Sequence, residues 1–195
     1  MTTDIAAYTY GNPDLDRSPV SLDDLHALQQ SLLWSDSDRE ALRRAGAILV
    51  PQTEDILDVW YGFVGGTSHL VATFAGADGE PDGDYLGRVR ARFGQWIADL
   101  TTREFDQSWL DYQEVIALRH HTEGKNQADG VDSPSTHVPL RHLIALIVPI
   151  TVTIRPFLAA HEPDAERVDE MYHAWLKAVT LTVALWARPY SAMTW

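Results

Sequence analysis

Histidines are the side chains in this sequence best suited to hold a metal ion, because the chain has eight of them and no cysteine. Without cysteine there can be no disulfide, thiolate metal site or iron–sulfur cluster. No two histidines stand four residues apart on a predicted helix, so a zinc site built on one helix is not expected. His120 and His121 are adjacent on an apolar helix and project about 100° apart, so only one can face a given site. The helical spacing slightly favours His120, which continues the face of Trp109, Tyr112 and Ile116.

The motifs of several other chemistries are missing. The sequence has no Gly-rich phosphate loop, no H-E-x-x-H, no G-x-S-x-G and no acidic metal loop. A formal charge of −13 argues against nucleic-acid partners and polybasic membrane attachment. The first ten residues lack the pattern of a signal peptide, and the most apolar run, 143–154, contains Pro149 and is too short to span a bilayer. We therefore expect a soluble, cytoplasmic protein with no membrane or nucleic-acid partner.

Apolar residues recur at helical spacing along most of the chain, and no strand pattern, repeat or linker interrupts them. This predicts an all-α, single-domain protein over residues 1–195, with an irregular segment at 1–20. Ser21 is the expected cap of the first helix, and Asp36 or Ser37 that of the second. The predicted helices cover about 22–32, 36–49, 51–62, 86–100, 107–121, 140–159 and 163–187, with loops at 76–83 and 125–139.

Segments spread over nearly the whole chain resemble protoglobins, single-domain relatives of globin-coupled sensors. The segments are YTYG at 8–11, DILDVWYGFV at 55–64, RARFGQWI at 90–97, WLDYQ at 109–113, LRHH at 118–121, PITVTIRPFL at 149–158 and ALWARPY at 184–190. Several of these motifs together make the resemblance specific.

The resemblance implies a globin-like helical sandwich with an extra N-terminal helix, and a non-covalent haem b held by His120 as the proximal ligand. Val89 occupies the position where many other globins carry a distal histidine, and Leu146 and Val148 stand where aromatic residues are common. The predicted haem-binding set is His120, Trp60, Tyr61, Val89, Phe93, Ile116, Leu146 and Ile150, with His120 as the metal ligand.

Haem iron needs a neutral imidazole on one side and an open second side if a gas is to bind. We therefore expect reversible binding of O2, CO and NO at a five-coordinate iron. The hydroxyl of Tyr61 is expected to donate to the gas, most strongly to oxygen because of its partial negative charge. The alternative is an ordinary core tyrosine with its hydroxyl satisfied elsewhere. Arg92 could pair with a haem propionate, but a solvated helix charge is at least as compatible with the sequence, so Arg92 stays outside the predicted set.

The role of the expected gas-binding protein, whether sensing, storage or detoxification, stays open. There remain three alternatives to gas binding. One is a haem enzyme such as a nitric oxide dioxygenase or peroxidase, although nothing resembles a flavin or nicotinamide site; whether the chain is an enzyme stays open. The second is a scaffold for non-natural haem chemistry. The third is a haem-free globin-fold interaction module, which the presence of His120, Val89 and Phe93 argues against.

A homodimer through the two C-terminal helices is also expected, because residues 174–187 are apolar on every side. Trp175, Val179 and Trp186 share one face, and Ala178, Leu181 and Leu185 share another. The resemblance implies the same partner, commonly as a four-helix bundle across a two-fold axis. The alternative is that the N-terminal helix covers the second face within the chain.

Overall fold

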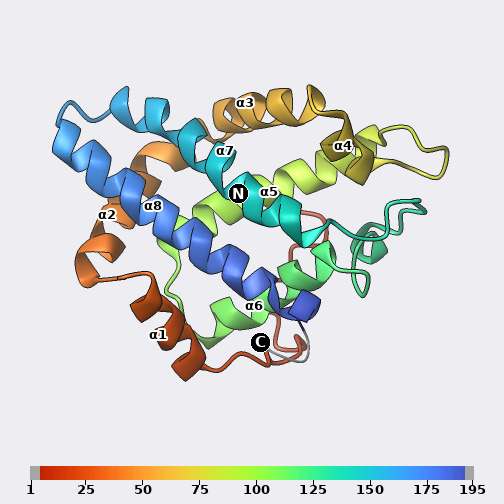
Figure 1. The fold of residues 1–195 in the computed structure, drawn as a ribbon, viewed down its shortest axis with the longest axis horizontal. Helices are drawn as coiled ribbons and strands as arrows, with labels where there is room; N and C mark the ends of the chain where they lie inside the picture. The colour runs from red at the N-terminus through yellow and green to blue at the C-terminus, as the bar shows by residue number, and fades with distance from the viewer. Residues whose placement is uncertain (1–4, 192–195) are drawn as a thin grey trace.

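The computed structural model describes residues 5–191, most of which are helical (Figure 1). The α-helices are α1 (Leu22–Ser31), α2 (Asp36–Leu49), α3 (Thr53–Gly65), α4 (Ser68–Val71), α5 (Gly83–Thr102), α6 (Gln107–His120), α7 (Leu140–Ala159) and α8 (Ala165–Trp186). Short 3-10 helices cover Val50–Gln52, Ala72–Phe74, Gln127–Asp129 and Arg188–Ser191. Within residues 5–191 there is no β-strand beyond an isolated bridge between Ala75 and Pro81, so the all-α prediction is confirmed.

Two serines begin the first two helices through the same capping arrangement. The side chains of Ser21 and Ser35 each accept a hydrogen bond from the backbone N–H three residues later. The residues at those positions, Asp24 and Asp38, in turn accept a hydrogen bond from the backbone N–H of the serine. The cap predicted at Ser21 is therefore confirmed. The cap predicted at Asp36 or Ser37 is wrong by one or two residues, because the cap is Ser35, whose side chain accepts from the backbone N–H of Asp38.

The core lies where α8 meets its neighbours. In Figure 1, α7 runs beside α8 and α2 crosses α8 from the other side. Trp109 of α6 and Trp175 of α8 are the largest fully buried side chains. These helices form the frame that holds the remaining apolar residues around one cavity.

The second apolar face of α8 is buried inside the chain and is not left for a partner. Leu181 on that face and Trp175 on the other are both 0 % exposed. The expectation that Leu181 belongs to an exposed face is therefore wrong. Among the N-terminal helices α2 packs against α8, with Lys177 of α8 bonded to Asp38 of α2 at 2.8 Å.

An exposed apolar face lies on α7. Ile144, Val148 and Val152 follow one another at four-residue spacing and are 53 %, 64 % and 52 % exposed; we call them the α7 stripe. Pro149 leaves the helix continuous, so α7 has 20 residues and is long and apolar enough to cross a bilayer by length and composition. The helix thus extends beyond the run 143–154, which by itself is too short for a bilayer. The same length and composition suit a core helix of a soluble protein.

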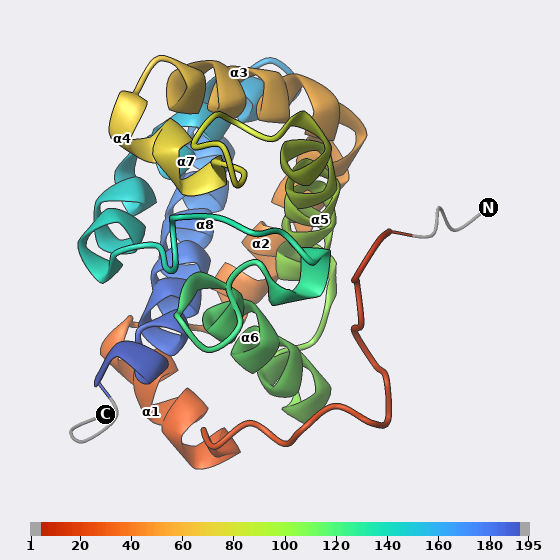
Figure 2. The same ribbon diagram turned by 90° about the vertical axis from the view of Figure 1, so that its right-hand side faces the viewer.

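The N-terminal segment contains no helix over residues 5–20, as predicted for that part of 1–20; residues 1–4 and 192–195 lie outside the described range. The segment is fixed by long-range bonds. The hydroxyl of Tyr8 donates to Asp99 Oδ2 at 2.7 Å, and Arg119 donates to the carbonyl of Ala7 at 2.6 Å. It therefore lies against α5 and α6 (Figure 2).

Candidate functional site

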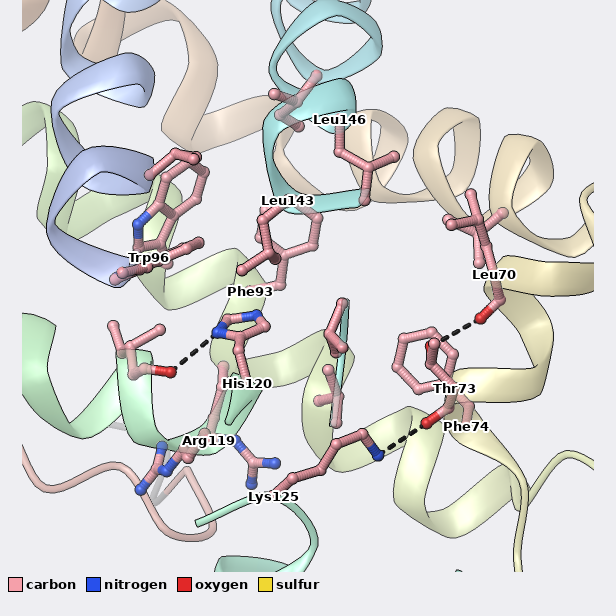
Figure 3. Close-up of a pocket in the computed structure, with 18 of the residues that line it drawn as sticks. Leu70, Thr73, Phe74, Phe93, Trp96, Arg119, His120, Lys125, Leu143 and Leu146 are labelled. Atoms are coloured by element: carbon pink, nitrogen blue, oxygen red, sulfur yellow. Dashed lines mark hydrogen bonds between the residues drawn. The ribbon is translucent and has the colours of Figure 1, made fainter. Parts of the chain in front are cut away.

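A largely apolar cavity of about 250 Å³ lies among α3, α5, α6, α7 and α8. Residues that are far apart in the sequence meet on its wall, as Figure 3 shows for Phe93, His120 and Leu146. All eight residues of the predicted haem-binding set line it: Trp60, Tyr61, Val89, Phe93, Ile116, His120, Leu146 and Ile150. The structure thus brings the predicted set together, while the role of each residue toward haem stays a prediction.

His120 is the last residue of α6 and presents its ring to this cavity. Its Nδ1 lies 2.8 Å from the carbonyl oxygen of Ile116, one turn earlier (Figure 3). A carbonyl can only accept, so Nδ1 carries the proton and donates. Burial lowers the pKa of His120 to about 4, so the ring is neutral at pH 7. The Nε2 lone pair is therefore free for a ligand, in the arrangement that metal-binding histidines use.

His121 is placed differently, because it caps α6 outside the cavity. Its ring packs edge-on against Tyr190, with centroids 5.0 Å apart. The hydroxyl of Tyr190 lies 2.6 Å from the carbonyls of both His120 and Val138, which fixes the end of the helix. Only one of the two adjacent histidines thus reaches the cavity.

Aromatic rings from α3 and α5 form the part of the wall predicted to be distal. Phe93 contacts Trp60 and Tyr61 edge-on, with centroids 5.6 and 6.4 Å apart. Burial raises the pKa of Tyr61 well above the usual value for a tyrosine, so its hydroxyl keeps its proton. That hydroxyl makes no hydrogen bond within residues 5–191, although Tyr61 lines the cavity. The reading of Tyr61 as a core tyrosine satisfied elsewhere is therefore not supported.

One edge of the cavity is cationic. Arg92, Arg119 and Lys125 all border it, and Figure 3 shows Arg119 and Lys125 below the His120 ring. Asp129 is the carboxylate on this edge, and it pairs with Arg92 at 2.6 Å. Arg92 is thus a buried ion-pair partner and not the solvated helix charge that the sequence also allowed.

Lys125 is only 6 % exposed and forms no ion pair with a carboxylate in the described part of the chain. Its Nζ donates to the carbonyl of Thr73 at 2.9 Å and to Asn126 Oδ1 at 2.7 Å. Burial lowers the pKa of Lys125 to about 8. Sequence reasoning missed Lys125 and Arg119. Arg119 precedes His120 and could have been noticed, whereas Lys125 stands in a polar loop that gives no signal.

These residues fit a haem group. A neutral imidazole with one free nitrogen, an apolar cavity and an edge with more cations than carboxylates match its iron, its macrocycle and its two propionates. Among the described residues, no cluster of three or more His, Asp or Glu forms a competing metal site.

The comparison with known proteins gives the same result. The family model Protoglobin matches residues 21–194, which is nearly the whole chain. No curated protein matches it. The all-α architecture of the described residues agrees with that family. The chain therefore belongs to the protoglobins, a family of haem-binding proteins with a globin fold.

Proposed function

We propose that this protein binds haem b through His120 and reversibly binds O2, CO and NO at a five-coordinate iron. The observation that carries the proposal is the hydrogen bond from His120 Nδ1 to the Ile116 carbonyl, at 2.8 Å. It selects the tautomer whose Nε2 lone pair faces the cavity, and the lowered pKa keeps that lone pair unprotonated at neutral pH. Bound haem supplies an iron centre with affinity for small diatomic gases.

On the opposite side of the cavity, Tyr61 offers a hydrogen-bond donor to the gas. Its hydroxyl is protonated and has no partner within residues 5–191. Val89 and Phe93 add only apolar surface, so they exclude water without competing for the iron. We propose that Tyr61 favours oxygen over carbon monoxide, because a donor gains more from an acceptor that carries partial negative charge.

The cationic edge would hold the two haem carboxylates. Arg119 and Lys125 lack carboxylate partners in residues 5–191, whereas Arg92 already shares Asp129. Burying a cation without a counter-charge is costly, so a carboxylate from the cofactor would relieve that cost.

A second copy of the chain is the proposed partner at the α7 stripe. Apolar side chains at Ile144, Val148 and Val152 remain in contact with water in the single chain. Exposed apolar rows of this kind mark contacts with proteins or lipid. The negative net charge disfavours an anionic lipid surface, so we propose that α7 pairs with α7 of a second copy, with α8 flanking it.

The visible spectrum of the purified protein tests the haem proposal. We expect a Soret band that shifts when carbon monoxide is added to the reduced protein. A protein that takes up no haem on reconstitution would overturn the proposal and leave the haem-free globin module as the better account.

A further inference from the structure

A second pair of histidines lies outside the cavity, on two elements that are far apart in the sequence. His69 belongs to the short helix α4, and His142 to the first turn of α7. Their ring centroids are 5.0 Å apart, and their planes are tilted by 33°. Neither imidazole makes a hydrogen bond within residues 5–191, so the ring nitrogens are not committed to another partner.

The surroundings of the pair disfavour protonation of His142. Desolvation, the charge of Arg141 and the proximity of His69 lower the pKa of His142. Two protonated rings at this separation would repel each other. A neutral imidazole is the form that ligates metal ions.

Imidazole pairs select late transition metals. Calcium and magnesium require oxygen ligands, whereas neutral imidazole suits zinc, copper and nickel. A tetrahedral zinc ion bound to two histidines at about 2.0–2.1 Å can complete its shell with water, because one side of this pair is open to solvent. His69 is exposed and His142 half-buried, so an ion can reach the pair.

We propose that His69 and His142 form a zinc-binding site that bridges α4 and α7. The site is separate from the proposed haem ligand, since neither histidine borders the cavity. The next residue after each histidine does border it: Leu70 and Leu143 are buried on the cavity wall (Figure 3). A metal ion bound here would hold two parts of that wall together from outside. The inference does not depend on haem binding.

Calorimetric titration of the untagged protein with Zn²⁺ tests the site. We expect one equivalent of zinc to bind, with at least about tenfold weaker binding after His69→Ala or His142→Ala. His26→Ala removes an exposed histidine from α1 and should leave zinc binding unchanged. Helical circular dichroism of each variant shows whether the fold is retained.

X-ray absorption at the zinc edge gives a second measurement that iron does not disturb. Two imidazole ligands in the wild type, and one in either single variant, are expected. Zinc affinity that is equal in the wild type and both variants would overturn the proposal. So would a zinc spectrum without two imidazoles, which would reduce the contact to ring packing alone.

Discussion

Trp186 of α8 stacks on the imidazole of His120, with ring centroids 4.8 Å apart and planes tilted by 26°. The indole is itself fixed, because its Nε1 donates to Oε1 of the buried Gln113 at 3.0 Å. The His120 ring is thus held on one face by Trp186 and at Nδ1 by the Ile116 carbonyl. Two independent contacts orient the nitrogen that faces the cavity.

Replacing Trp186 should therefore loosen the cofactor. Trp186→Leu removes the stacking surface. We expect haem loss to accelerate by roughly tenfold, which is the lower end of the effect seen when a group that orients a metal ligand is removed. Transfer of haem to an acceptor protein in excess measures this rate. Trp34→Leu is the matched control, since Trp34 packs on Phe105 away from the cavity. Equal haem loss from both variants would show that Trp186 only contributes to the core.

Tyr61→Phe tests the proposed hydrogen bond to the gas. A bond to a charged acceptor contributes roughly 1.5–3 kcal/mol, so oxygen should dissociate about ten- to a hundredfold faster. Carbon monoxide carries little charge and should change much less. Stopped-flow and flash-photolysis rates compare the two gases. Tyr85→Phe is the control, because the Tyr85 hydroxyl already contacts Asn126 at 3.1 Å. Equal changes for both gases would indicate a steric effect.

The buried amine of Lys125 predicts a pH dependence in the haem-free chain. The pKa of Lys125 is about 8 in the folded chain, against an ordinary value of 10.5. Between these values the unfolded chain binds more protons, so this residue makes the free energy of unfolding rise with pH. From about pH 7.5 to about pH 9.5, the wild type should gain roughly 1–2 kcal/mol relative to Lys125→Met. Urea unfolding at both pH values measures the difference, and parallel pH profiles would contradict a lowered pKa.

The α7 stripe predicts the oligomeric state. We expect the wild type to sediment at twice the chain mass at micromolar concentration, and Val148→Glu to shift it to the monomer with little change in melting temperature. Leu33→Glu places the same charge at another exposed apolar residue and should leave the dimer intact. A monomeric wild type would rule out this interface, and co-flotation with neutral vesicles would assign the stripe to lipid.

The sequence was sufficient to predict the helices that are long and amphipathic. The bounds predicted for α7 match the structure, because apolar residues fill it from end to end. The four-residue α4 was not predicted, since so short a helix has no periodicity to detect. The faces of α8 were also misjudged. Local sequence shows that a face is apolar but not whether the same chain covers it, and here Leu181 is fully buried within the chain.

The same distinction applies to the site. The apolar wall could be predicted, because its residues lie on helices whose inward faces repeat regularly. The cationic edge could not: Lys125 comes to the cavity through a loop, and it is held there by the distant carbonyl of Thr73. Nor could the sequence distinguish a solvated Arg92 from an Arg92 paired with Asp129. That ion pair forms only because the loop after α6 folds back onto α5.

The central claim is that His120 holds the iron and His121 does not, and comparing their glycine variants tests it most directly. His120→Gly should lose the five-coordinate ferrous spectrum after haem reconstitution and regain it when free imidazole fills the space. His121→Gly should keep the spectrum nearly unchanged, because its ring packs on Tyr190 outside the cavity. A normal ferrous spectrum from His120→Gly without imidazole, or its loss in His121→Gly alone, would contradict the assignment.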